Sequence, residues 1–454
     1  MTQHNTKNNS KSVVRFALLG GGIAVVIAIT FLIIDSSGNK TTTQSRQTSG
    51  SVTTLAPSTT RTPNTSSAPT STSTVAASTT TNNSSVPLNF APSSASFVNG
   101  ETGYVLGGVP CASSTNYCAE LTTTSNGGQN FTGVSVNNVT IASKSAIASE
   151  SATPNSVSKV HFVTTQLGYI FDPGLYITTN GGSSFAPVVV PGLNQIGSGF
   201  YASNIVVSGT SVTALLVPAN TTGQNHNSTL ISASISTPSE FVTLNTASPI
   251  ASNEILMGNS YGSLLVSPSA SSPSISYLGA TATAWQSLSP SCLSGTDQYG
   301  TPAIAGATIF SSLSTNSTPD LAVACTLGVG AGSSSKQLDI SENTGSTWNV
   351  INTLPNPGII NAIAASSSTN IAVAASSGET WIYTTSNGGN SWSIFNFGGT
   401  TLASEAMPVN DLGYFSATNI YAILGSVGDV NKGSVQSELY ISHDAGISWT
   451  PVIF

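Results

Sequence analysis

The chain has 454 residues, of which 39% are hydrophobic and only 6% are charged, whereas an average soluble domain carries about 25% charged residues. Its 42 glycines, 22 prolines and long Ser, Thr and Asn tracts disfavour helices, because these residues lose entropy or compete for backbone hydrogen bonds there. A β-rich protein is expected, and an ordinary cytosolic enzyme is not. No arginine follows Arg61, which excludes functions that need arginine clamps in the remaining chain.

The first predicted element is a membrane-spanning helix over residues 16–34 (FALLGGGIAVVIAITFLII), which are uncharged and mostly apolar. As a helix they would span about 28 Å, the thickness of a bilayer core. Lys7, Lys11 and Arg15 precede the segment, so the positive-inside rule places residues 1–15 in the cytoplasm and the rest outside. A cleaved signal peptide is the alternative, but its apolar stretch is usually shorter and ends in small residues. The sequence favours a retained signal anchor.

The second predicted element is a low-complexity stalk over residues 35–89. Between residues 36 and 85, 29 of 50 residues are Ser or Thr, and none is aromatic. Such a segment buries too little apolar surface to offset its ordering entropy. A disordered linker, of the kind that is O-glycosylated in Ser/Thr/Pro-rich tracts, is expected.

The remaining residues, 90–454, contain one eight-residue pattern five times, here called the box turn. It reads Ser or Thr, any residue, Asn or Asp, any residue, Gly, any residue, a small polar residue, and Phe or Trp. The third and eighth positions are Asn126 and Phe131, Asn180 and Phe185, Asn343 and Trp348, Asn387 and Trp392, and Asp444 and Trp449. Asn or Asp accepts turn N–H groups and Gly supplies a positive φ, so each copy predicts a hairpin turn. The closing aromatic residues are expected in the core.

The box turn resembles the Asp-box, or BNR, repeat of sialidases, sortilin-type receptors and photosystem II assembly-factor propellers. The resemblance extends over about residues 94–454, with specific matches in the boxes and in the pairs Gly103-Tyr104, Gly168-Tyr169 and Gly413-Tyr414. Four of the five copies have Asn for Asp, and the first two end in Phe. The resemblance implies an all-β propeller in which each box joins the third and fourth strands of a blade.

The spacing of the box turns predicts seven blades. Successive copies lie 54, 44 and 57 residues apart, but the second and third are separated by 163, about three periods. Two blades without a box are therefore expected, with strands at 204–217 and 229–235, and at 255–266 and 275–285. Propeller repeats of about 40–50 residues leave six or eight blades open. A strand over Phe90 to Phe97 is expected to complete the last blade and close the ring.

The four cysteines all follow the predicted membrane segment, and an even count in an oxidising compartment indicates disulfides. Four cysteines allow three connectivities. The pairs Cys111–Cys118 and Cys292–Cys325 are favoured, because each falls within one expected blade. His161, His226 and His443 are isolated in the sequence, so neither a metal site nor a cofactor is expected.

Sialidase activity is excluded, because its carboxylate clamp needs arginines. Other glycoside hydrolases need two carboxyl groups about 5–9.5 Å apart, and nothing in the sequence pairs two acids. The acids outside the box turns that could reach the mouth of the propeller, where its central channel opens, and act as catalytic carboxyl groups are Glu101, Asp172, Glu254, Asp297, Asp320 and Asp411. The glycine-rich run 328–336 lacks the Gly-Lys-Ser/Thr ending of a phosphate loop, and a flexible loop is expected there.

Residues 90–454 contain four lysines and sixteen acidic residues, a net charge of −12, which disfavours nucleic acids and anionic membrane surfaces as partners. The sequence therefore predicts a membrane-anchored, extracytoplasmic propeller that binds protein or glycan ligands without catalysis. A carbohydrate-active hydrolase and a purely structural cell-envelope protein are the alternatives. The sequence does not indicate the oligomeric state.

Overall fold

The computed structural model describes most of the chain after residue 85. The described ranges are 86–112, 116–143, 146–147, 152–193, 196–197, 199–219, 227–244, 250, 254–268, 272–294, 303–310, 319–330, 332–398, 407–427 and 436–454. The predicted membrane segment 16–34 and residues 35–85 of the predicted stalk lie outside them. Within these ranges, no helix has the length and apolar character that crossing a membrane requires.

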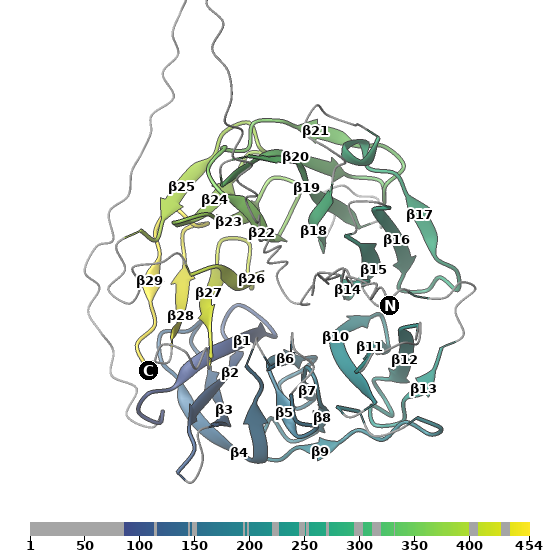
Figure 1. Ribbon diagram of the computed structural model, residues 1–454, viewed down its shortest axis with the longest axis vertical. Helices are drawn as coiled ribbons and strands as arrows, with labels where there is room; N and C mark the ends of the chain where they lie inside the picture. Colours follow the sequence, from purple (N-terminus) through teal and green to yellow (C-terminus); the bar gives the residue numbers. More distant parts are fainter. Residues whose placement is uncertain are drawn as a thin grey trace, which may run out of the picture. The chain divides into compact units, whose positions relative to one another are not determined.

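Seven sheets follow one another along the chain and form a seven-bladed β-propeller (Figure 1). Blade 1 contains β1 (Ala91–Phe97), β2 (Gly103–Pro110), β3 (Tyr117–Thr124), β4 (Thr132–Ile141) and the short parallel β5 (Ser156–Val157). Blade 2 contains β6 (Lys159–Phe162), β7 (Gly168–Phe171), β8 (Leu175–Thr178) and β9 (Ala186–Pro187). Blade 3 contains β10 (Phe200–Ser208), β11 (Ser211–Pro218), β12 (Thr229–Ser234) and β13 (Val242–Thr243).

The other four blades have the same order. Blade 4 contains β14 (Ile255–Asn259), β15 (Gly262–Ser267), β16 (Ser274–Gly279) and β17 (Gln286–Leu288). The 3-10 turn η1 (Ser291–Leu293) leads to blade 5, with β18 (Ala303–Phe310), β19 (Asp320–Gly330), β20 (Ser333–Ser341) and β21 (Asn349–Ile351). Blade 6 contains β22 (Ile359–Ala365), β23 (Ile371–Ser376), β24 (Thr380–Thr385) and β25 (Ser393–Asn396), and blade 7 contains β26 (Val409–Tyr414), β27 (Ile420–Ser426), β28 (Gln436–Ser442) and β29 (Thr450–Pro451).

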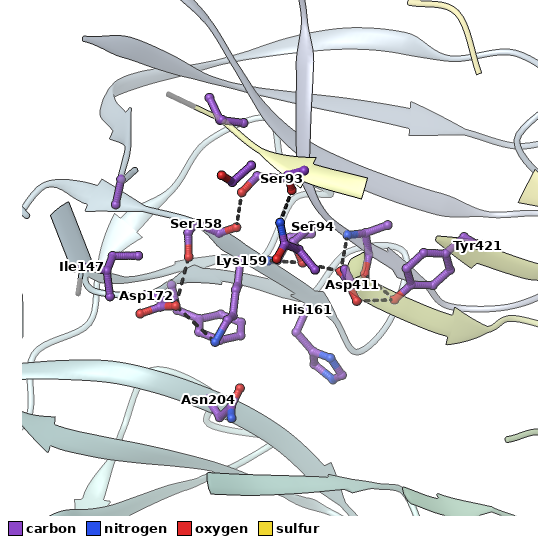
Figure 2. Close-up of a pocket in the computed structure, with 18 residues that line it drawn as sticks. Ser93, Ser94, Ile147, Ser158, Lys159, His161, Asp172, Asn204, Asp411 and Tyr421 are labelled. Carbon is purple, nitrogen blue, oxygen red and sulfur yellow. Dashed lines mark hydrogen bonds and ion pairs between the residues drawn. The ribbon is translucent and has the colours of Figure 1, made fainter. Parts of the chain in front are cut away.

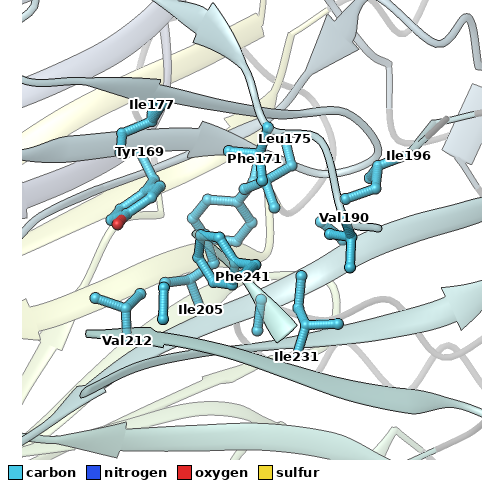
Figure 3. Packing of buried hydrophobic residues seen from close by; sticks show 14 of the residues in the cluster. Tyr169, Phe171, Leu175, Ile177, Val190, Ile196, Ile205, Val212, Ile231 and Phe241 are labelled. Carbon is cyan, nitrogen blue, oxygen red and sulfur yellow. The ribbon is translucent and has the colours of Figure 1, made fainter. Parts of the chain in front are cut away.

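The all-β fold and the seven blades that the box spacing predicted are confirmed. The two blades without a box turn are β10–β13 and β14–β17, where the sequence placed them. The first strand of each blade lies innermost and packs against the first strand of a neighbouring blade. Between the blades lie apolar clusters such as that of blades 2 and 3 (Figure 3), where Tyr169 and Phe171 of β7 pack with Ile231 and Phe241.

The expectation that residues 90–97 complete the last blade is wrong. β1 pairs with β2 of its own blade, and β29 supplies the fourth strand of blade 7 by pairing with β28. The chain continues far enough past Trp449 to make that strand itself. Blades 1 and 7 instead meet through side chains: the ring of Phe97 stacks on Phe415 with centroids 4.0 Å apart, and that of Phe454 meets Phe90 at 4.7 Å.

Each box turn follows the third strand of its blade and has one hydrogen-bond pattern. In blade 6, the Thr385 hydroxyl donates to Asn387 Oδ1 over 2.9 Å and accepts the Gly389 N–H, also at 2.9 Å. Asn387 Oδ1 in turn accepts the Ser391 N–H at 3.0 Å. The same hydroxyl and side-chain oxygen contacts recur in the other four copies, at Thr124, Thr178, Ser341 and Ser442.

The glycine at the fifth box position lies against the preceding blade in all five copies. A Cβ atom there would overlap a side chain of that blade: Ile441 at Gly128, Leu121 at Gly182, Leu288 at Gly345, Ile351 at Gly389 and Thr384 at Gly446. Of the closing aromatic residues, Phe131 and Trp449 are buried. Phe185, Trp348 and Trp392 are half-buried and pack against apolar clusters. The box turns therefore join adjacent blades as well as adjacent strands.

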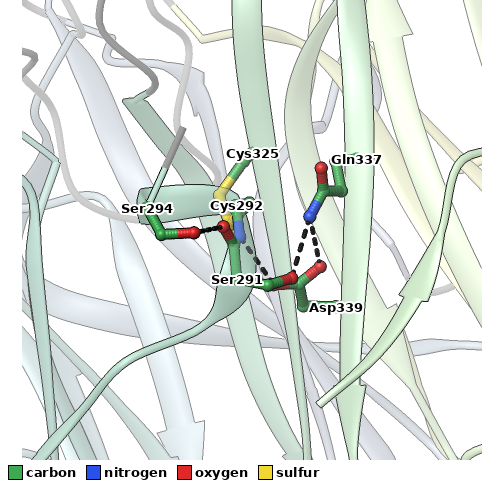
Figure 4. Close-up of a disulfide and its surroundings, with 6 residues drawn as sticks. All are labelled: Ser291, Cys292, Ser294, Cys325, Gln337 and Asp339. Atoms are coloured by element: carbon green, nitrogen blue, oxygen red, sulfur yellow. Dashed lines mark hydrogen bonds between the residues drawn. A yellow bond between two sulfur atoms is a disulfide. The ribbon is translucent and has the colours of Figure 1, made fainter. Parts of the chain in front are cut away.

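Both predicted disulfides are present. Cys111–Cys118 closes the loop between β2 and β3, and Cys292–Cys325 ties η1 to β19 (Figure 4). The fully buried Asp339 carboxylate holds the same turn, because its Oδ2 accepts the Ser291 hydroxyl and the Cys292 N–H, each at 2.8 Å. The turn η1 is therefore held covalently and by hydrogen bonds.

The described residues of the glycine-rich run, 328–330 and 332–336, are not the flexible loop that was expected. β19 and β20 extend into it as a hairpin, in which Gly330 pairs with Ser333. Lys336 is buried, and its ammonium group donates to the carbonyl oxygens of Ser334, Asn356 and Pro357 at 3.2, 2.6 and 3.1 Å. Burial lowers the pKa of Lys336 to about 8. Three carbonyl groups accept from the ammonium group and hold Lys336 of β20 against the connection between blades 5 and 6.

Candidate functional site

The topology distributes the candidate acids between the two faces of the propeller. The box turns follow third strands, so they share a face with the turns between first and second strands. Glu101 lies in such a turn, where its carbonyl accepts the Gly127 N–H of a box at 2.8 Å, and Asp320 begins the second strand β19. Glu254 precedes the first strand β14, and Asp297 lies outside the described residues. The structure does not bring Glu101, Glu254 and Asp320 together.

Asp172 and Asp411 do line one pocket, near the face at which the first strands begin (Figure 2). The pocket has a volume of about 240 Å³ and is formed mainly by blades 1, 2, 3 and 7. Its polar lining consists of Ser93, Ser94, Ser158, Lys159, His161, Asp172, Asn204, Asn410, Asp411, Tyr421 and Ser426.

The polar lining results from one repeated position of the innermost strands. In blades 1, 3, 5, 6 and 7 the first strand carries a β-bulge, and the residues that follow the bulge are Ser94, Asn204, Gly306, Ala362 and Asp411. In blade 2 the register from the box turn assigns this position to Lys159, which pairs with Phe171. Blades 7, 1, 2 and 3 are thus polar here, whereas blades 5 and 6 have only Gly and Ala.

Lys159 and Asp172 form an ion pair in the pocket. Lys159 Nζ lies 3.1 Å from Asp172 Oδ2, and their side chains are 13% and 7% exposed. The same Nζ donates to the Ser203 carbonyl at 2.8 Å, and the Ser158 hydroxyl donates to Asp172 Oδ2 at 3.0 Å. Because the two charges neutralise each other in a nearly buried setting, this part of the pocket presents fixed polar groups without net charge.

Asp411 joins blade 7 to blade 1. Its Oδ2 accepts the Ser94 hydroxyl and the Ala95 N–H, each at 2.9 Å, and its Oδ1 accepts the Tyr421 hydroxyl at 3.2 Å. Burial raises the pKa of Asp411 above its ordinary value, although these hydrogen bonds and the Lys159 charge act in the opposite direction. Burial and the neighbouring Asp411 carboxylate also raise the pKa of Tyr421. The Tyr421 hydroxyl thus stays protonated and remains a donor.

The raised pKa of Asp411 predicts a pH-dependent effect of Asp411→Asn. A carboxyl group whose pKa is raised by folding stabilises the protein below its unfolded pKa, and this contribution is lost as the pH rises through the folded pKa. Asn keeps an oxygen for the Ala95 N–H and does not ionise. The unfolding free energy of the variant minus that of the wild type is therefore expected to be larger at pH 7 than at pH 4. Urea unfolding at both pH values measures this, and a pH-independent difference would contradict it.

His161 of β6 also lines the pocket, and burial lowers its pKa to about 4. The imidazole is therefore neutral at pH 7. A histidine whose pKa falls on folding contributes stability that is lost as the pH falls from its unfolded value, here from 6.5 towards 4. At about 1.4 kcal/mol per pKa unit, discounted for partial exposure, this loss amounts to about 2–3 kcal/mol.

We therefore expect His161→Phe to flatten the fall in unfolding free energy between pH 6.5 and pH 4. Equilibrium unfolding across this range measures the slope. His443→Gln, at an exposed position, is the matched control and is expected to retain the wild-type slope. An unchanged slope in His161→Phe would show that another group is responsible.

Three polar side chains of the pocket have no protein partner in the described part of the chain. They are the His161 imidazole, the Asn204 amide and the Ser426 hydroxyl, and each can donate and accept hydrogen bonds. The same ranges contain no cluster of three His, Cys, Asp or Glu side chains that could hold a metal ion. Sequence reasoning named the two acids but missed Lys159, His161, Asn204 and Tyr421. Register counted from the box turns is the signal that could have located Lys159.

No protein-family model matches the chain, and neither does any curated protein. Among solved structures it is similar to YCF48 bound to a D1 peptide, at 15% identity and a TM-score of 0.49 over 79% of this chain and 95% of that one. For YCF48 from Cyanidioschyzon merolae the identity is 12% and the TM-score is 0.40, over 64% of this chain and 83% of that one. For TolB from Acinetobacter baumannii the identity is 14% and the TM-score is 0.37, over 68% of this chain and 66% of that one. At these values no ligand or activity is transferred to this chain.

Proposed function

We propose that the chain is a binding module without catalysis. The pocket lined by Asp172 and Asp411, called the axial pocket from here on because the innermost strands of blades 7, 1, 2 and 3 form it, holds one uncharged polar group of a protein or glycan ligand. The observation that carries this proposal is the combination of open groups, Asn204 and His161, with a Lys159–Asp172 pair that neutralises itself. A pocket of about 240 Å³ is smaller than the usual small-molecule site of about 300–1,000 Å³. It suits one residue of a larger ligand.

Binding to the full chain tests this proposal. Peptide and glycan arrays are expected to retain the wild type, and Asn204→Leu is expected to lose at least tenfold in affinity, since it removes the open amide and narrows the pocket. Asn349→Leu, at an exposed position on the outer strand β21, is the matched control and is expected to bind like the wild type. Equal loss in both variants, or no loss in Asn204→Leu, would contradict a role for the pocket.

We further propose that residues 16–34 anchor the chain in a membrane, with the propeller outside. The apolar run, the preceding cations and two disulfides in the propeller support this arrangement. Protease added to intact cells is expected to digest the propeller, and alkaline carbonate is expected to leave the chain in the membrane fraction. A protease-protected propeller would contradict the topology, and release by carbonate would contradict the anchor.

A glycoside hydrolase is the second candidate, because Asp172 and Asp411 line the same pocket in different environments. One carboxylate forms an ion pair, whereas burial raises the pKa of the other, an arrangement that acid/base pairs use. Hydrolysis on the glycan array that is lost in both Asp172→Asn and Asp411→Asn, with binding retained, would favour this candidate. Binding without turnover would favour the module.

A further inference from the structure

We infer that the group held in the axial pocket is a neutral sugar residue with adjacent free hydroxyls. This inference rests on the proposed binding function and narrows its ligand. It follows from four features of the pocket: the hydrogen-bonding capacity that the protein leaves open, the charges on either side, the apolar part of the lining, and the volume.

The protein leaves open one N–H donor, one carboxylate acceptor and three groups that can both donate and accept, namely His161, Asn204 and Ser426. An ammonium group has three N–H donors, and Lys159 Nζ uses two of them, on Asp172 Oδ2 and the Ser203 carbonyl. Both contacts to Asp172 are on Oδ2, so Oδ1 is left to accept. His161 and Asn204 can each donate and accept. Figure 2 shows Asn204 of β10 facing the side of the pocket that carries Lys159, Asp172 and His161.

A hydroxyl group matches this set better than a carboxamide or a charged group. One hydroxyl can donate to Asp172 Oδ1 and accept from Lys159 Nζ at once, because its single oxygen has both capacities. A neighbouring hydroxyl can then pair with Asn204 or His161 in either direction. A carboxamide separates its donor and acceptor on different atoms, so it cannot satisfy the two ends of one ion pair with one atom.

The charges of the pocket disfavour ionic ligands. An anion would be desolvated beside Asp172 and Asp411, and Lys159, the one cation among the described residues that line the pocket, is already paired. A cationic ligand would be repelled by the ammonium group of Lys159. Burying an unpaired charge costs far more than burying a hydroxyl that finds partners. Acidic sugars and basic side chains are therefore poor ligands for this site.

The remaining lining supplies an apolar surface for the C–H groups of a sugar ring. Ala142, Ile147 and Val427 lie in the connections at this face and line the same pocket. Polar groups on one part of the lining and apolar groups on another are the usual composition of a small-ligand site. The volume of about 240 Å³ limits the inserted part of a glycan to about one ring.

The test uses the full chain on one array that carries neutral hexose-terminated, sialylated, sulfated and amine-terminated glycans beside a set of peptides, in buffer with EDTA. We expect retention on neutral glycans and competition by a soluble neutral methyl glycoside at millimolar concentration. Asn204→Leu is expected to lose at least tenfold in binding, and Asn349→Leu to lose none. Competition by the methyl glycoside is measured on the wild type, so it also decides the case if Asn204→Leu misfolds.

The failures of the two proposals are distinguishable. Retention on peptides alone, or on charged glycans at least as strongly as on neutral ones, would overturn the neutral-sugar inference and leave the binding module standing. The absence of binding to every glycan and peptide would overturn both. Retention on neutral glycans that Asn204→Leu does not weaken and the methyl glycoside does not displace would place the sugar site elsewhere on the propeller and overturn the inference.

Discussion

Replacing Gly389 by alanine is expected to lower the free energy of unfolding by about 3 kcal/mol, the sum of a left-handed conformation and overpacking. Gly389 has a φ of 84°, and a Cβ there would overlap Cγ2 of Ile351 in the preceding blade. That methyl group is attached to a branched Cβ with few rotamers, so it cannot easily move away. Urea or thermal unfolding of the full chain measures the loss.

Gly388→Ala is the matched control, because it lies in the same box turn with a φ of 66°. A Cβ at Gly388 would lie 3.4 Å from the nearest atom, the Ser368 carbonyl oxygen. Gly388→Ala therefore carries the penalty of the left-handed conformation without the collision, and it is expected to lower the free energy of unfolding by about 1 kcal/mol. Equal losses in the two variants would show that the contact between blades contributes nothing beyond backbone strain.

Removal of the Cys292–Cys325 disulfide is expected to have the other large effect. The bond closes a loop with a sequence separation of 33, and the chain-entropy relation gives about 4 kcal/mol for a loop of this size. The double variant Cys292→Ala/Cys325→Ala is therefore expected to unfold at much lower denaturant than the wild type. Asp339 still holds the Ser291 hydroxyl and the Cys292 backbone in the variant, so the native turn is expected to persist.

The second disulfide provides the comparison. Cys111–Cys118 has a sequence separation of only 7, for which the same relation gives about 2.5 kcal/mol. The variant Cys111→Ala/Cys118→Ala is expected to lose less stability than the other pair under non-reducing conditions. A larger loss from the short loop would mean that contacts in the folded state, and not loop entropy, determine the contribution of each bond.

The candidate site shows where sequence reasoning lost precision. Nothing in the sequence pairs Asp172 with Asp411, because they are 239 positions apart and belong to blades 2 and 7. Topology alone could have separated them from Glu101 and Asp320, since the end of a strand at which a residue lies fixes the face that it reaches. Register counted from the box turn could have located Lys159. His161 and Asn204 could not have been selected, because single polar residues in apolar strands carry no distinguishing pattern.

The composition of the sequence predicted a β-rich protein, and the resemblance of its box turns to the Asp-box repeat implied an all-β propeller. The spacing of the boxes favoured seven blades over six or eight, and the positions of the cysteines favoured the two observed disulfides among three connectivities. These features depend on local chemistry: a turn that needs Asn or Asp and Gly at fixed positions, repeated at blade spacing, and cysteines close together in the chain. Only the tertiary structure decided how the ring closes and which polar side chains share the axial pocket. Both depend on contacts between blades 1 and 7, such as Asp411 with Ser94, and contacts between residues far apart in sequence leave no local pattern.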